Sequence, residues 1–69
     1  MAITQYIIRI KNKTGDDSYI WNWSFENGIS RTSKVVEGRL YDKDAAEHIV
    51  HTEQKYDLSL VEVTIHLNE

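Results

Sequence analysis

Residues 18–28 read SYIWNWSFENG, and this stretch decides the fold. Its large side chains alternate with smaller or polar ones, the period of two expected of a strand with one buried face. Four of the chain's seven aromatic residues share one parity: Tyr19, Trp21, Trp23 and Phe25. We therefore predict a strand over residues 18–26 whose aromatic stripe faces the core.

The dipeptide Asn27-Gly28 predicts a hairpin turn at the end of this strand. Both residues tolerate the positive φ angles that a two-residue type I′ turn requires. Such a turn would place Trp21 opposite Lys34 in a third strand over residues 29–36. That strand is polar near its start, and Arg31 is the kind of residue that discourages pairing along an exposed edge.

The segment before the hairpin predicts another strand. Residues 3–13 alternate between apolar and polar side chains, and residues 14–17 collect turn-forming types. Tyr6, Ile8 and Ile10 would then share one face.

A helix and a final strand are predicted after the hairpin. Asp42 or Asp44 supplies the N-cap, the latter with Glu47 three residues on, and the helix continues to about Lys55. Its apolar stripe centres on alanines 45 and 46, which leave room for large rings beneath them. Residues 58–67 alternate again and predict the last strand.

The predicted fold is a single α+β domain over residues 1–69, a β-β-β-α-β two-layer sandwich. One helix packs on a four-stranded mixed or antiparallel sheet. The expected strand order is 3-2-1-4, with the last strand parallel to the first. In the last strand we expect an inward row and an outward row. The inward row is Val61, Val63, Ile65 and Leu67, and the outward row is Leu60, Glu62, Thr64 and His66.

The composition limits the classes of function. The chain has 69 residues, no cysteine and a formal net charge of -3, so disulfides, thiol catalysis and thiolate metal sites are excluded. No run of 18 apolar residues and no basic leader segment is present, which predicts a cytoplasmic protein without a membrane span. A chain this short needs self-association or unusually heavy core residues for stability.

No motif for catalysis or for a cofactor is found in the sequence. The glycines stand alone at positions 15, 28 and 38, so no phosphate-binding loop is predicted. His48 and His51 are three residues apart on the predicted helix, but His66 points to the other sheet face, so no third metal ligand is placed. We expect no enzyme activity, no cofactor and no metal.

The aromatic stripe has two interpretations. In the first it is the core, covered by the helix. In the second interpretation, part of the stripe is exposed. Trp21 and Trp23 then anchor a protein interface, with Lys34 placed for a cation–π contact. Stacking of nucleic-acid bases on the strand is a weaker third possibility.

The outer sheet face is a second candidate protein-binding surface. Ile7, Ile20 and Leu60 would lie there on adjacent strands, where aligned aliphatic side chains could form a homodimer patch. Scattered exposed aliphatic residues are otherwise common and need no functional explanation.

Charge divides the chain into unlike halves. Residues 35–69 hold eight acidic against three basic residues. A candidate acidic face combines five of the acidic residues: Asp42, Asp44, Glu47, Glu53 and Asp57. The acidic balance of the whole domain argues against nucleic acid as a partner, and it favours a basic protein surface instead.

Residues 40–49, LYDKDAAEHI, followed by an alternating strand, give the chain a familiar layout. It resembles many short accessory proteins of Gram-positive phages and prophages, in which an aromatic hairpin precedes a helix and a closing strand. The resemblance implies an accessory role in a phage or mobile element and transfers no functional residue. Some such proteins inhibit host machinery by mimicking nucleic acid.

Taken together, these features predict a non-catalytic protein-interaction module with an unidentified protein partner. The alternative is an acidic effector that blocks a basic nucleic-acid-binding surface of a host or defence protein. The two differ in salt dependence, because only the effector should weaken steeply with ionic strength.

Overall fold

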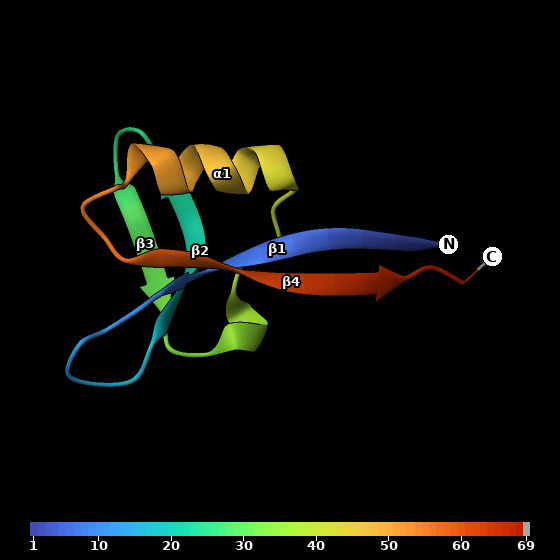
Figure 1. The fold of residues 1–69 in the computed structure, drawn as a ribbon, viewed down its shortest axis with the longest axis horizontal. Helices are drawn as coiled ribbons and strands as arrows, with labels where there is room; N and C mark the ends of the chain where they lie inside the picture. Colours follow the sequence, from blue (N-terminus) through green and yellow to red (C-terminus); the bar gives the residue numbers. More distant parts are fainter. Residues whose placement is uncertain (69) are drawn as a thin grey trace.

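A computed structural model describes residues 1–68 and has a small α+β fold with one helix and a four-stranded antiparallel sheet (Figure 1). In chain order the elements are β1 (Ala2–Ile10), β2 (Ser18–Ser24), β3 (Gly28–Thr32), the single 3-10 turn η1 (Val35–Glu37), α1 (Lys43–Thr52) and β4 (Leu58–His66). Each predicted strand is present, and each ends earlier than expected. Within residues 1–68, no helix combines the length and the apolar character needed to cross a bilayer.

The sheet order is β3-β2-β1-β4, as the sequence predicted, but β4 runs antiparallel to β1. The expectation of a parallel last strand is therefore wrong. The reason is where the helix starts: Tyr41, just before it, pairs with Tyr6 in the middle of β1. From there α1 carries the chain to the end of β1, and Leu58 enters the sheet opposite Ile10.

The hairpin between β2 and β3 has a three-residue loop instead of the predicted two-residue turn. Ser24 pairs with Gly28, and the Ser24 hydroxyl accepts a 3.0 Å hydrogen bond from the Asn27 amide. Gly28 has a φ of +69°, and Asn27 does not share this left-handed conformation. A type I′ turn needs positive φ at both positions, so the local geometry selects the longer loop.

A β-bulge at Trp21 breaks the aromatic stripe. Ile20 pairs with Arg31 and Asn22 pairs with Ser30, so Trp21 is an extra residue without a partner on β3. The extra residue reverses the parity of the strand, which places Ile20 and Trp23 on the helix side. Ile20 is completely buried, whereas Trp21 is 51% and Phe25 76% exposed. The prediction of a continuous buried stripe is wrong.

The core lies between α1 and the sheet. Its buried residues are Ile8, Ile10, Ile20, Ala46 and Ile49, with Trp23, Ile29, Leu58 and Leu60 packed against them. Leu60 lies opposite Ile8 on β1 and so faces the helix. The predicted inward row of β4 therefore lies on the opposite sheet face, because the pairing with β1 sets the parity.

The helix begins where the sequence predicted. The Asp42 side chain accepts a 2.8 Å hydrogen bond from the Ala45 amide, which makes Asp42 the N-cap. Ala46 and Ile49 are the buried residues of the helix, on its sheet-facing side, and Ala45 is half-buried. The helix ends at Thr52, one turn before the predicted end at Lys55.

The turn η1 lies on the sheet face opposite α1 (Figure 1), where the adjoining Gly38 packs against Ile7. The chain then returns to the helix side between β1 and β2. The Arg39 amide donates to the Ile20 carbonyl at 3.0 Å, and Tyr41 exchanges two 2.8 Å hydrogen bonds with Tyr6. The observed β1–β2 register spans Arg9↔Tyr19 and Ile10↔Ser18, which leaves room for this crossing.

Candidate functional site

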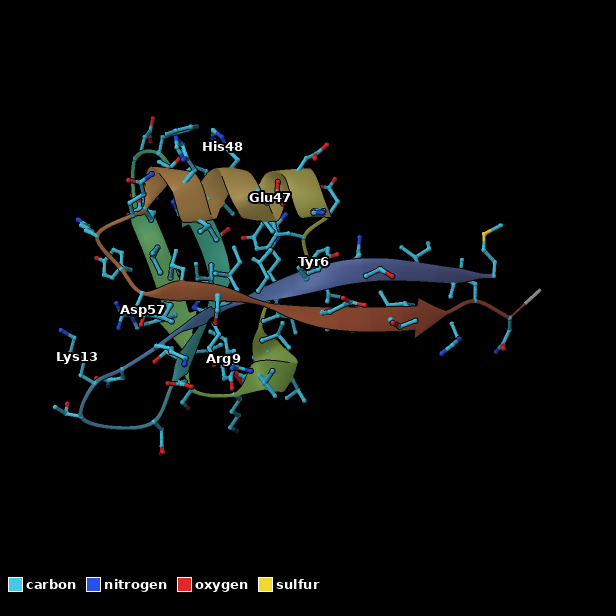
Figure 2. All side chains as sticks on the ribbon, viewed as in Figure 1. Tyr6, Arg9, Lys13, Glu47, His48 and Asp57 are labelled. Atoms are coloured by element: carbon cyan, nitrogen blue, oxygen red, sulfur yellow. The ribbon has the colours of Figure 1, made fainter. Side chains whose placement is uncertain are left out.

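Trp23, Phe25 and His48 form a partly exposed aromatic cluster where the hairpin loop meets α1. His48, on the outer part of the helix, is labelled in Figure 2. The Trp23 and Phe25 rings meet edge to face at 4.7 Å, and each lies within 5.9 Å of the His48 ring. The Trp23 indole N–H donates to a Glu53 carboxylate oxygen at 3.3 Å. Trp23 is therefore held partly in the core, and Phe25 supplies most of the exposed ring surface.

Trp21 and Lys34 are not the neighbours that the sequence predicted. Trp21 occupies the bulge, while Lys34 lies beyond the end of β3 and precedes η1. The Lys34 amide donates a 3.3 Å hydrogen bond to the Thr32 hydroxyl oxygen. The three-residue hairpin loop shifted the register, so the proposed cation–π pair is not formed by cross-strand pairing.

Ile7, Ile20 and Leu60 do not form a shared outer patch. Ile20 and Leu60 face the helix, whereas Ile7 lies on the opposite face and is covered by Gly38. Ile7 is only 7% exposed. A charged residue at Ile7 or Ile20 would be buried without a partner, so it would unfold the monomer instead of testing a dimer.

The residues of the candidate acidic face extend along the helix and into the turn after it: Asp42, Asp44, Glu47, Glu53 and Asp57. A ten-residue helix is about 15 Å long, so the first and last of them are well separated. Asp42 caps the helix, and Glu47 lies 4.0 Å from Lys43. The structure does not gather these carboxylates into one cluster.

The free edge of β4 is a feature that the sequence interpretation did not identify. β4 pairs with β1 over nine residues without a register shift, and it is the last strand in the sheet order. Residues 58–66 contain no lysine, arginine or proline and a single carboxylate, Glu62. Edge strands are normally protected by such residues, by bulges or by being short. The other edge strand, β3, has five residues and carries Arg31.

Two backbone hydrogen bonds define which groups the β4 edge presents. The Lys11 amide donates to the Asp57 carbonyl, and the Leu67 amide donates to the Met1 carbonyl, both at 2.9 Å. Odd-numbered residues of β4 therefore direct their N–H and C=O groups toward β1. The even-numbered residues direct theirs to the open edge: Leu58, Leu60, Glu62, Thr64 and His66.

A shallow groove lies between this edge and the helix. Its volume is about 330 Å³, and α1 and β4 line it through Val50, His51, Leu58 and Leu60 among others. Its floor is largely apolar because Leu58 and Leu60 belong to the helix-facing row of β4. A strand placed beside β4 would direct alternate side chains into this groove.

The outer part of the β1–β4 ribbon extends beyond the helix (Figure 1). On the face opposite α1, Ile3 pairs with Ile65 and Gln5 with Val63. Ile3 is 42% exposed, and Val63 and Ile65 are half-buried. This apolar surface continues directly from the open β4 edge.

Among residues 1–68, no three histidine, aspartate or glutamate side chains are placed to hold a metal ion. Comparison of the chain with family models, with curated proteins and with solved structures found no match. The candidate site is therefore defined by its geometry alone.

Proposed function

We propose that the chain is a non-catalytic protein-interaction module whose open β4 edge accepts a strand from a partner protein. The observation that carries this proposal is the unprotected nine-residue edge of β4. In such strand addition, backbone hydrogen bonds supply affinity and pockets for alternate side chains supply specificity. The non-catalytic part of the proposal rests on the sequence, which has no cysteine and no catalytic motif.

The groove beside β4 supports the same proposal. An incoming strand would extend the sheet beneath the helix, so that helix and sheet act as two layers. Its helix-facing side chains would cover Leu58 and Leu60 and enter the 330 Å³ groove. The opposite side chains would extend the apolar row that contains Val63 and Ile65.

The alternative of an acidic effector has less support. Glu53 accepts a hydrogen bond from Trp23, and Asp57 lies among basic residues at the far end of the helix. An accessory role in a phage or mobile element remains part of the proposal and is supported by the layout of residues 40–67.

A proline substitution at Thr64 tests the proposal. Thr64 directs its N–H to the open edge, so Thr64→Pro removes an edge donor without removing a bond to β1. Thr64→Val is the matched control because it changes the side chain and keeps the N–H. We expect tagged wild-type protein and Thr64→Val to capture the same partner from the native cell, quantified by mass spectrometry, with at least a tenfold loss for Thr64→Pro.

Thermal unfolding of the three proteins provides the necessary control for folding. If folded Thr64→Pro captured the partner as well as the wild type, the β4 edge would not be the binding surface, and the proposal would be wrong.

A further inference from the structure

A second groove, of about 680 Å³, lies at the end of the sheet near Lys13 and Asp57 (Figure 2). The end of β1 and the following loop form one side of it. Arg31 of β3 and the turn between α1 and β4 form the rest. The Lys11 amide donates to the Asp57 carbonyl at 2.9 Å and so ties the two sides together.

Four basic residues converge on this groove: Lys11, Lys13, Arg31 and Lys55. All four are exposed, and Asp57 is the single carboxylate among the lining residues. Within residues 1–68 the ion pairs are Arg9–Asp17 and Lys43–Glu47, so none of these four cations is paired. Half of the chain's eight basic residues thus lie unpaired in one groove of a protein with a net charge of -3.

Tyr56 holds two of these cations in place. The Arg31 guanidinium carbon lies 5.7 Å from the centre of the Tyr56 ring, and the Lys55 ammonium nitrogen lies 5.3 Å from it. Both distances are within the range of a cation–π attraction. Because two like charges are held against one ring, an anion bound between them would lower their mutual repulsion.

We infer that this groove binds the phosphate backbone of a single-stranded nucleic acid. Phosphates would lie against the unpaired cations, and the Asn12 and Gln54 amides at the groove wall can donate to and accept from bases or sugars. A basic groove combined with an aromatic ring is the arrangement that single-strand binders use. An acidic peptide would find little aliphatic surface, because Ile10 is the one aliphatic lining residue.

The acidic balance of the whole chain does not oppose this inference at short range. Salt at physiological concentration screens exposed charges beyond about 8 Å, so the four local cations dominate inside the groove. The inference does not rest on the strand-addition proposal, because three of its four cations come from outside α1 and β4: Lys11 and Lys13 follow β1, and Arg31 lies on β3. Gln54 is the one residue that lines both grooves.

Fluorescence anisotropy of a labelled single-stranded oligothymidylate, titrated at several salt concentrations, tests the inference. Each phosphate contact on a single strand contributes a slope of about -0.7 in log K against log salt, so four contacts give about -2.8. We expect saturable binding at low ionic strength with a slope between about -2 and -3.

Two variants and one control locate the binding. Arg31→Ala and Lys55→Ala should each weaken binding and make the slope shallower by about 0.7. Lys43→Ala removes a cation that lies outside the groove and pairs with Glu47, so it should leave the affinity unchanged. All three positions are exposed, and thermal unfolding confirms that each variant is folded.

Three results would overturn the inference. The first is no saturable binding at low ionic strength, and the second is an equal loss of affinity in Lys43→Ala. The third is equally effective competition by poly-L-glutamate, which would assign the groove to acidic peptides.

Discussion

Gly38 is the residue at which the fold leaves no room for a side chain. A Cβ atom there would lie 2.6 Å from the Ile7 Cγ2 atom and 3.1 Å from the Val35 carbonyl oxygen. The close approach lets the η1 segment cover Ile7 before the chain crosses between β1 and β2. Gly38 is therefore required by packing, and its φ of -62° makes no special demand on glycine.

We expect Gly38→Ala to lower the free energy of unfolding by about 1–3 kcal/mol, because the added methyl group overpacks the contact with Ile7. Urea unfolding followed by tryptophan fluorescence measures this change. Gly15→Ala is the matched control, since its Cβ would meet only the Asn12 amide nitrogen at 3.5 Å. Equal stability of Gly38→Ala and wild type would contradict the close contact.

Tyr41 carries a buried hydroxyl that has no hydrogen-bond partner among residues 1–68. Burial raises the pKa of this hydroxyl above its ordinary value of 10.0, and the nearby Arg39 guanidinium offsets part of the rise. Above pH 10 the unfolded chain therefore releases the Tyr41 proton more readily than the folded chain does. Stability is unaffected by this group below pH 10 and falls as the pH rises beyond it.

Tyr41→Phe should raise the free energy of unfolding by about 1 kcal/mol at neutral pH, because an unsatisfied buried hydroxyl is removed. The variant should also lose less stability than the wild type above pH 10. Urea unfolding on both sides of pH 10 measures the two effects. A loss of stability at neutral pH would mean that the hydroxyl has a partner in solution.

The bulge in β2 decides which large side chains form the core. It buries Ile20 completely and leaves Trp21 51% exposed, the reverse of what an unbroken alternating strand would do. Ile20→Ala should therefore cost about 2–5 kcal/mol, and Trp21→Ala less than about 1 kcal/mol. If the domain does not tolerate Ile20→Ala, Ile20→Val should still cost about 1 kcal/mol. Chemical denaturation gives the order of the two losses, and the reverse order would contradict the bulge.

The elements that local chemistry specifies could be predicted from the sequence. Asp42 offers a capping oxygen three residues before the Ala45 amide, and Gly28 can adopt positive φ at the hairpin. The bulge could not be predicted, because an extra residue leaves the alternation of residue types unchanged and appears only when β2 is paired with β3. The observed hairpin has a three-residue loop, in which the Asn27 amide donates a hydrogen bond to the Ser24 hydroxyl. The sequence pattern alone does not show that this loop is favoured over a two-residue turn, so it does not give the hairpin register.

The open edge of β4 could not be predicted from the sequence for a related reason. Both rows of β4 are apolar, since Leu58 and Leu60 alternate with Val61 and Val63, so the sequence alone does not say which row faces the helix. Pairing with β1 settles it. The signal that was available is the absence of lysine, arginine and proline over nine strand residues, which distinguishes β4 from the protected β3 edge.

The molecule as a whole is more extended than its length requires. Its dimensions are 42 × 25 × 17 Å, and its radius of gyration is 12.5 Å, against about 11 Å for a typical domain of this length. Its accessible surface is 5120 Å², where a monomer of this mass exposes about 4,500 Å². The excess over that expectation is about 600 Å². The extended β1–β4 ribbon accounts for the shape, and an isolated two-stranded ribbon is only marginally stable in water.

At high concentration, and without another strand donor, we expect the β4 edge to pair with a second copy of itself. In a symmetric antiparallel pair centred on Val63, Glu62 lies opposite Thr64 of the second copy, so the two Glu62 carboxylates do not face each other directly. The Val63 side chains meet on the apolar face, and Val61 lies opposite Ile65 of the second copy. Light scattering should then give twice the 8.1 kDa mass of one chain, while Thr64→Pro should give a single chain and Thr64→Val should behave as the wild type. A wild-type monomer at every concentration would contradict self-pairing. Binding of a strand from a different protein would still be open to test, by the capture experiment with the same variants.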